Sequence, residues 1–321
     1  MENGDTAAQT RRTTSWKERR MGVRCTWWVP FAFAEWFCER LSDRLDRWAF
    51  LDVLERVGHL AILVAVVFYI VEAPERRKGN QYYAWQIINS LKGSRTDGGR
   101  KYAIQDLLRD GVSLAGIDLT DAILPNVDFK NADLRQGRFW RAELLDADFQ
   151  RAVLSGSRFN ESLLNRANFS EARLKNVEFG EACLEDANFS HADLEEANFY
   201  NAKLRNAAFT DSNLSGAKLE RADLTGAAFV DANLCAARLG QADVAGVDFS
   251  RANLRRVRLT ACVHWKDIKN VRLANIIGMP EPPPGFLEWA REHGAVEIED
   301  DLEWKRLIDQ ERRKGGGRWR R

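Results

Sequence analysis

The chain has 321 residues and carries 48 Lys and Arg against 47 Asp and Glu, a formal net charge of +1 at pH 7. This length suits one large domain or two, and the balanced charge excludes a general electrostatic attraction to nucleic acid. The five cysteines include no CxxC pair, so they signal neither a zinc site nor a disulfide framework, and they favour a reducing compartment.

Residues 1–48 form a basic, aromatic-rich N-terminal segment. Four of its tryptophans, Trp27, Trp28, Trp36 and Trp48, lie near the hydrophobic stretch that follows and are of the kind found at membrane interfaces. The stretch Ala32-Phe33-Ala34 resembles a signal-peptide cleavage site, but the apolar run around it is short and broken by Pro30, which disfavours a cleaved signal peptide.

Residues 57–71, "VGHLAILVAVVFYIV", carry no formal charge apart from a protonatable histidine. A helix of this length spans about 22 Å, short of the hydrocarbon core of roughly 30 Å. The helix extends back to Ala49 because the polar residues in between fall on one stripe, with His59 as its last member. We therefore predict a single transmembrane helix over 49–73. The alternative is a helix packed on the end of the following domain or in a dimer.

The positive-inside rule does not decide the orientation of this helix, because three Lys or Arg flank it on each side. The more distant N-terminal arginines favour a downstream domain outside the cell, whereas the free cysteines favour one inside. We place the downstream domain in the cytoplasm.

Residues 74–111 are predicted to be a helical connector and N-terminal cap. Tyr82, Trp85 and Ile88 share a helix face, and "KGSRTDGG" then breaks the helix. A short helix over 100–111, with Tyr102, Ala103, Leu107 and Leu108 at helical spacing, ends at a glycine and covers the start of the next domain.

Residues 112–261 repeat every five positions, as "ADLEEANFYNAKLRNAAF" (192–209) illustrates. Each unit has a small residue, most often Ala, followed two positions later by Leu or Phe. Those two side chains share one face of an extended chain, but the next small residue, three positions on, would face outward unless the chain bends. A bend in every unit winds the chain into a solenoid with an apolar interior.

The phenylalanines indicate how many sides each coil has. Between Phe129 and Phe209 they recur every ten residues, which sorts them onto two faces only if a coil has an even number of sides. Four sides give a coil of twenty residues and two Phe columns that stack from coil to coil. About thirty pentapeptides then make a rod of some seven and a half coils, roughly 36 Å long.

The segments "ADLEEANFYN" and "RADLTGAAFVDANL" resemble the pentapeptide repeat family, whose consensus is A-(D/N)-L-x-x. The resemblance implies an all-β repeat solenoid, a right-handed quadrilateral parallel β-helix. The preceding hydrophobic helix is similar to that of bacterial members that carry one at the N-terminus. The resemblance implies a fold and no single function, because the family's members differ widely.

Residues 262–312 are predicted to form a C-terminal cap. "GFLEWAREHG" and "DLEWKRLIDQERRK" indicate two short helices, separated from the repeats by "GMPEPPPG". Phe286, Leu287, Trp289 and Ala290 are expected to cover the last coil, with dimer formation through the terminal helices as the alternative. The tail 313–321 is predicted to be basic and disordered.

Catalytic, cofactor and metal motifs are absent from the sequence, so we predict no site residues, no cofactor and no enzymatic activity. Acidic residues of the repeats are interpreted as outward turn residues. Cys262 falls at a buried small position, whereas Cys183 and Cys235 fall at outward positions.

Two functions remain. The first is a membrane-tethered scaffold that binds unidentified proteins through the outer faces of the rod. The alternative is a soluble DNA mimic, as in the family's topoisomerase-protecting members, which interact with gyrase. A DNA mimic needs a strongly acidic rod, but the repeats carry 22 acidic against 18 basic residues. The basic residues Arg138, Arg158, Lys218, Arg238 and Arg258 are expected to recur on one face, which favours the scaffold.

Overall fold

The computed structural model describes residues 49–316 and contains two compact units, the first ending at Arg77 and the second beginning at Lys78. The predicted segment 1–48, with Cys25 and Cys38, and residues 317–321 of the predicted tail lie outside the described residues. The helical elements are α3 (Ala49–Ser90), α4 (Arg100–Arg109), η2 (Trp265–Asp267), α5 (Phe286–Glu292) and α6 (Asp301–Gly316).

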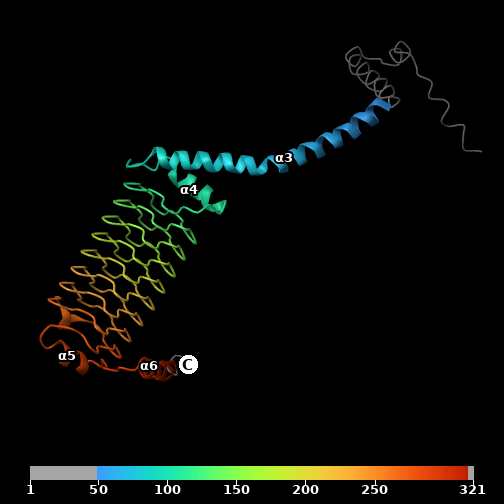
Figure 1. The fold of residues 1–321 in the computed structure, drawn as a ribbon. Coiled ribbons are helices and arrows are strands. Elements are labelled where there is room, and N and C mark those ends of the chain that lie inside the picture. Colours follow the sequence, from blue (N-terminus) through green and yellow to red (C-terminus); the bar gives the residue numbers. More distant parts are fainter. Residues whose placement is uncertain (1–48, 317–321) are drawn as a thin grey trace, which may run out of the picture. The chain divides into compact units, whose positions relative to one another are not determined.

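Between α4 and α5 the chain forms a repeat solenoid of stacked coils, which Figure 1 shows running from green to orange. Parallel β-bridges join one outward residue of each five-residue unit to the residue twenty positions later, as in Asn168↔Asn188 and Asn188↔Ala208. A twenty-residue register contains four five-residue units, so each coil has four sides, as the phenylalanine spacing predicts. The pairing takes the form of isolated bridges rather than long strands, because the chain bends after every unit.

Each pentapeptide makes the same backbone contacts. The N–H of Phe169 donates to the carbonyl of Asn188 in the next coil at 2.7 Å, and the N–H of Asn188 donates back to Ala167 at 3.0 Å. The corner residue adopts a left-handed backbone, as His191 does with a φ of 61°. This conformation favours glycine and asparagine, yet most corners here carry other residues, because the coils on either side hold the backbone in place.

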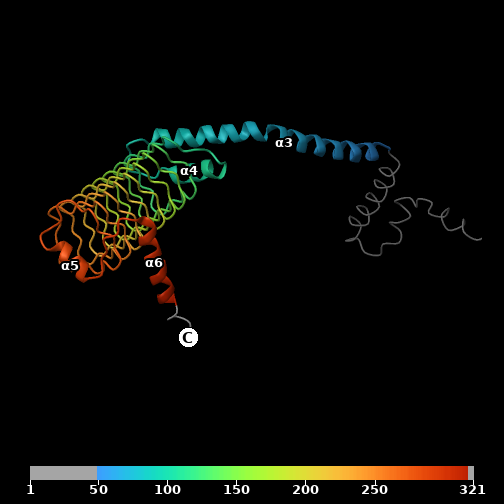
Figure 2. The ribbon, with the colours of Figure 1, turned by 60° about the horizontal axis from the view of Figure 1, so that its bottom comes forward.

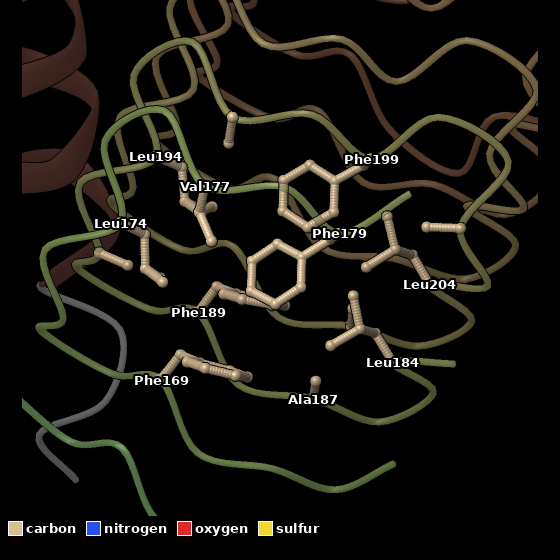
Figure 3. Packing of buried hydrophobic residues seen from close by; sticks show 14 of the residues in the cluster. Phe169, Leu174, Val177, Phe179, Leu184, Ala187, Phe189, Leu194, Phe199 and Leu204 are labelled. Atoms are coloured by element: carbon tan, nitrogen blue, oxygen red, sulfur yellow. The ribbon is translucent and has the colours of Figure 1, made fainter. Parts of the chain in front are cut away.

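Two stacked columns of phenylalanine fill the interior (Figure 3). The rings of Phe169 and Phe189 are stacked at 4.9 Å between centroids, and those of Phe179 and Phe199 at 5.1 Å. Across the interior, Phe179 meets Phe189 edge to face at 5.8 Å. All four rings are fully buried, and both offset stacking and edge-to-face contact are favourable aromatic geometries.

The solenoid continues beyond residue 261, where the five-residue period predicts its end. Asp248 pairs with Asn270 and Asn253 with Asn275, so the register changes from twenty to twenty-two residues in this coil. The short helix η2 supplies the two extra residues at one corner. Because the number of residues per coil changes there, the five-residue period is lost from the sequence. Val271, Ala274 and Ile276 nevertheless continue the buried core.

Helices close the N-terminal end of the solenoid. Ala103, Ile104 and Leu107 of α4 and Ala84 and Ile88 at the end of α3 belong to the same buried core as the first coils. The predicted packing face of α4 is partly wrong, because Tyr102 is 71% exposed. The buried face of α4 instead includes Arg100, which lies one helical turn before Ala103 and Ile104.

The C-terminal helices have different environments. Phe286 and Ala290 of α5 are buried in the core, and Leu287 and Trp289 pack against it. In contrast, α6 lies against outward-facing residues of the last coils and leaves the rod obliquely (Figure 2). It runs to Gly316, so residues 313–316 of the predicted disordered tail are helical.

The helix α3 is 42 residues long and passes through Pro74 without ending. The predicted boundary between a membrane helix at 49–73 and a connector at 74 is therefore not marked by a helix end.

Candidate functional site

The first candidate region is the apolar part of α3. The helical stretch Gly58–Ser90 is long and apolar enough to cross a membrane, and none of its most apolar 18-residue window is buried. Leu60, Phe68 and Val71 are 59%, 60% and 66% exposed. This surface needs a partner or a bilayer, because continuous apolar exposure is unfavourable in water.

Pro74 interrupts the helical hydrogen bonds at the end of the apolar segment, and Arg76 contacts the backbone there. Proline has no N–H and disturbs the helical bonds of the preceding turn. The guanidinium of Arg76 lies over the ring of Tyr69 at 4.1 Å and donates to the Tyr69 carbonyl oxygen. The carbonyl that loses its helical donor at Pro74 is that of Ile70, four residues earlier, so the Arg76 contact with Tyr69 does not replace the missing bond.

At the N-terminal cap, one buried arginine holds the connection between α3 and α4. Arg100 is fully buried, and its Nη2 donates to the carbonyls of Leu91 at 2.7 Å and Ser94 at 2.6 Å. Burial lowers the pKa of the Arg100 guanidinium, while Asp97 acts in the opposite direction. Since an arginine pKa starts far above neutrality, Arg100 remains charged and crosslinks the loop by charge-assisted bonds.

On the outside of the rod, opposite charges pair from coil to coil at the corners. Arg141 bonds Asp121 at 2.8 Å, and Arg166 bonds Asp146 at 2.6 Å, each pair being twenty residues apart. The hydrogen bond from Arg141 lowers the pKa of Asp121, and that from Arg166 lowers the pKa of Asp146. These acidic residues therefore serve as partners of neighbouring arginines.

The asparagines and aspartates of the consensus also hold turns. The side-chain oxygen of Asn188 accepts the backbone N–H of Ser190 at 3.0 Å, and its amide donates to Asn168 in the preceding coil at 3.3 Å. Such turns stabilise a bend. Aspartates make the same turn, as Asp128 does with the N–H of Lys130 and Asp148 with that of Gln150, so the interpretation as turn residues is confirmed for these aspartates.

A third region, which we call the cationic face, is one bridged column on a single side of the rod. The column contains Asp118, Arg138, Arg158, Glu178, Asn198, Lys218, Arg238 and Arg258. The five basic residues that the sequence places on one face do share this column. Near its start, Arg138, Arg158 and the exposed Trp140 line a shallow hollow with a volume of about 380 Å³.

The cysteines of the rod lie where the sequence predicts. Cys262 is buried, and burial raises the pKa of its thiol to about 11, so it is protonated at neutral pH. Cys183 and Cys235 are half-buried on the outside. Among the described residues there is no group of three or more His, Cys, Asp or Glu side chains that could hold a metal ion.

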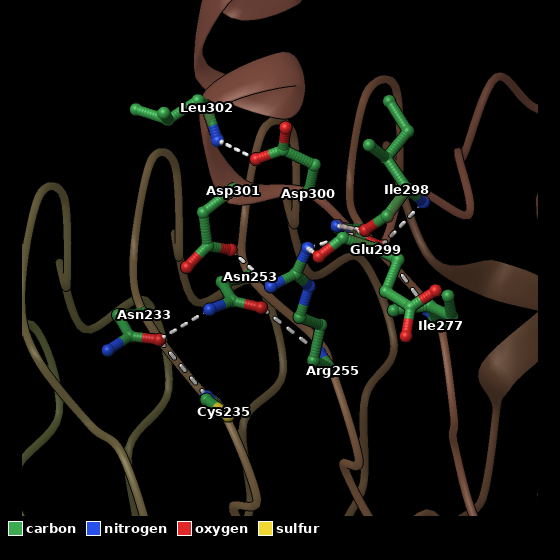
Figure 4. Close-up of polar contacts among 11 residues, drawn as sticks. Asn233, Cys235, Asn253, Arg255, Ile277, Ile298, Glu299, Asp300, Asp301 and Leu302 are labelled. Atoms are coloured by element: carbon green, nitrogen blue, oxygen red, sulfur yellow. Dashed lines mark hydrogen bonds and ion pairs between the residues drawn. The ribbon is translucent and has the colours of Figure 1, made fainter.

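Sequence reasoning missed the contacts that attach α6. Arg255 donates to the carbonyls of Ile298 and Glu299 and pairs with Asp301 (Figure 4). The buried Trp304 donates its indole N–H to the Leu273 carbonyl at 3.0 Å. The only signal in the sequence is the spacing of Trp304 and Ile308, which puts two apolar side chains on one face of a charged helix.

Comparisons with known proteins agree with the coils. A family model described as "Pentapeptide repeat region" matches residues 132–209 and 182–275. A second, described as "Pentapeptide repeats (8 copies)", matches residues 110–141. Together the matches run without a gap from residue 110 to residue 275, more than half of the chain. No curated protein matches the chain.

Several solved structures are similar to the chain. HetL, a protein involved in heterocyst differentiation regulation from the cyanobacterium Nostoc sp. strain PCC 7120, is 27% identical, with 54% of this chain and 81% of HetL covered and a TM-score of 0.35. QnrB1, a plasmid-mediated fluoroquinolone resistance protein, is 17% identical, with 59% and 94% covered and a TM-score of 0.32. A protein from the thylakoid lumen of Arabidopsis thaliana is 35% identical, with 27% and 64% covered and a TM-score of 0.23.

Proposed function

Because the chain belongs to the pentapeptide repeat family, we propose that it is a non-enzymatic scaffold, tethered to a membrane by α3, that binds protein partners through the outer faces of its rod. In this proposal the rod is a right-handed quadrilateral β-helix of about thirty pentapeptides. The repeats present regular surfaces on all sides, which suits the binding of extended or repeated partners.

The proposal that α3 attaches the chain to a membrane is supported by the exposed apolar surface of this helix. A core helix of a soluble domain is mostly buried, but the apolar window of α3 has no buried residue. The basic residues Arg76, Arg77 and Lys78 follow shortly after the uncharged run 57–71, as expected where a helix leaves the hydrocarbon. We place the rod in the cytoplasm, which agrees with the free thiols of Cys183, Cys235 and Cys262.

Carbonate washing of membranes tests the tether. We expect the full chain to remain in the membrane pellet, because α3 is held in the hydrocarbon and not by charge. Replacing Val64 and Val67 by Lys should move most of the protein to the supernatant, since each charge near a helix centre costs roughly 2.5–3.5 kcal/mol of insertion free energy.

The matched control replaces the same two residues by Leu, which keeps the segment apolar and should leave the protein in the pellet. Recovery of the unmodified chain in the wash would show that α3 does not anchor it.

A further inference from the structure

The cationic face stacks like charges on neighbouring coils. Lys218 is bridged to Arg238, and Arg238 to Arg258, so three cationic side chains leave the backbone at intervals of about 4.8 Å. All three are exposed. Like charges directly opposite each other on paired strands are destabilising, so the isolated rod gains nothing from this arrangement.

Elsewhere on the rod several opposite charges pair twenty residues apart, as in Arg251 with Asp231 at 2.7 Å, and the bridged like charges there, Asp128↔Asp148 and Asp223↔Asp243, are acidic. In the column itself Arg138 approaches Asp118 at 3.9 Å, and Arg238 approaches Glu220 of the adjoining corner at 4.0 Å. No ion pair is recorded between Lys218 or Arg258 and any acidic residue of the described part of the chain. The C-terminal half of the cationic face therefore keeps an excess of positive charge.

Exposed aromatic side chains adjoin the same face. Within the repeats, the exposed large apolar residues are Trp140, Leu163 and Tyr200. Trp140 and Tyr200 both occupy the corner beside the cationic column, three coils apart. Arg221 donates to the Tyr200 hydroxyl at 3.0 Å, and Arg141 lies over the Trp140 ring at 4.1 Å.

We propose that the cationic face binds the headgroups of anionic phospholipids. Arginine and lysine attract anionic lipids, and Trp and Tyr favour the headgroup level of a bilayer. The inference rests on the proposed tether, because a rod attached to the membrane meets headgroups at a high effective concentration and needs only weak contacts. Anionic lipid then supplies the counter-charges that the column lacks.

The test compares lysine acetylation in the full chain, reconstituted in nanodiscs of neutral phosphatidylcholine or of phosphatidylcholine with phosphatidylglycerol. Lys218 lies on the cationic face, whereas Lys203, which is also exposed, lies on another side of the rod and serves as the internal control. We expect acetylation of Lys218 to slow by roughly threefold or more in the anionic discs and to recover in high salt. Acetylation of Lys203 should not change.

Charge-reversal variants test whether the protection of Lys218 from acetylation depends on the other basic residues of the cationic face. Arg238→Glu combined with Arg258→Glu should abolish the protection of Lys218, and Arg173→Glu, an exposed arginine of a different column, should leave it intact. Thermal melts of each variant serve as the control for correct folding.

Equal acetylation of Lys218 in both kinds of disc would overturn the proposal. Protection in neutral discs on addition of duplex DNA, without protection by anionic lipid, would also overturn it and assign the face to nucleic acid. Carbonate washing distinguishes a failure of the tether, since a chain retained in the membrane with Lys218 unprotected contradicts only this inference.

Discussion

Phe189 and Ser190 are adjacent in the chain but have opposite environments. Phe189 is fully buried between Phe169 and Phe209, at centroid distances of 4.9 and 5.0 Å. Ser190 is partly exposed and donates its backbone N–H, not its hydroxyl, to the Asn188 side chain. The side chain of Phe189 therefore contributes to folding, while that of Ser190 is replaceable.

We expect Phe189→Ala to destabilise the rod by roughly 3–5 kcal/mol, because it removes a ring from a closed stack and leaves a cavity. Ser190→Ala should change the stability by less than about 0.5 kcal/mol. Thermal melts of the full chain compare the two, and a broadened transition for Phe189→Ala would reflect local unfolding of a repeat array. Equal losses for both variants would contradict the assignment of inward and outward positions.

At this scale the sequence predicts inward positions better than degrees of exposure. The columns of small and large residues follow from the period alone, and Phe169 and Phe189 lie where it places them. Ser170 follows Phe169 as Ser190 follows Phe189, so the period predicts that both serines face solvent, yet Ser170 is only 9% exposed. Gln150 of the preceding coil donates to Glu171, the residue after Ser170, at 3.5 Å, and the five-residue period does not determine such side-chain conformations.

At the scale of elements, α5 and α6 illustrate two kinds of predictability. The helix α5 buries Phe286 and Ala290 in the core, as an apolar cluster after a solenoid suggests. The helix α6 instead lies against outward residues, through Trp304 and through Arg272 with Glu311 at 2.7 Å. Those partners are far apart in sequence, so the period could predict the helix but not its position.

Trp304→Ala should release α6 from the rod without unfolding the coils, because it removes the main buried side chain of α6 and leaves the Leu273 carbonyl without its indole partner. We expect trypsin to cleave within 293–316 several-fold faster, with little change in the main thermal transition. Leu302→Ala on the same helix is the control, since Leu302 is 64% exposed. Equal cleavage of the Trp304→Ala variant and the unmodified chain would show that α6 is held by other contacts.

At the scale of the whole molecule, charge separates the two candidate functions. A rod that mimics duplex DNA must present continuous negative charge. Here a bridged column carries Arg138, Arg158, Lys218, Arg238 and Arg258 on one side. Corner arginines such as Arg141 and Arg166 further neutralise carboxylates of the neighbouring coils.

We therefore expect the detergent-solubilised full chain to leave DNA supercoiling by gyrase unaffected at concentrations equal to that of the enzyme. A standard supercoiling assay measures this, with the Arg238→Glu and Arg258→Glu double variant as a more acidic comparison. Inhibition by the unmodified chain would favour the DNA-mimic function over the scaffold.

The architecture of the whole rod was predictable because one rule, a bend in every five residues, repeats through the chain. The closing coil was not, because two additional residues at η2 change the register where the buried pattern is also weakest. Membrane insertion and the choice of a partner depend on the bilayer and on other proteins, about which the five-residue repeat carries no information.

The twenty-residue register fixes how the two halves of the rod are rotated relative to each other. Deleting twenty consecutive residues, such as 170–189, would remove one coil and keep every column in line, so both caps would meet the same surfaces on a rod about 4.8 Å shorter. Deleting five residues would instead turn everything downstream by one side. Lys218, Arg238 and Arg258 would then lie a quarter-turn away from Arg138 and Arg158. Changes in length are thus tolerated in whole coils, whereas fractions of a coil rotate one half of the surface against the other.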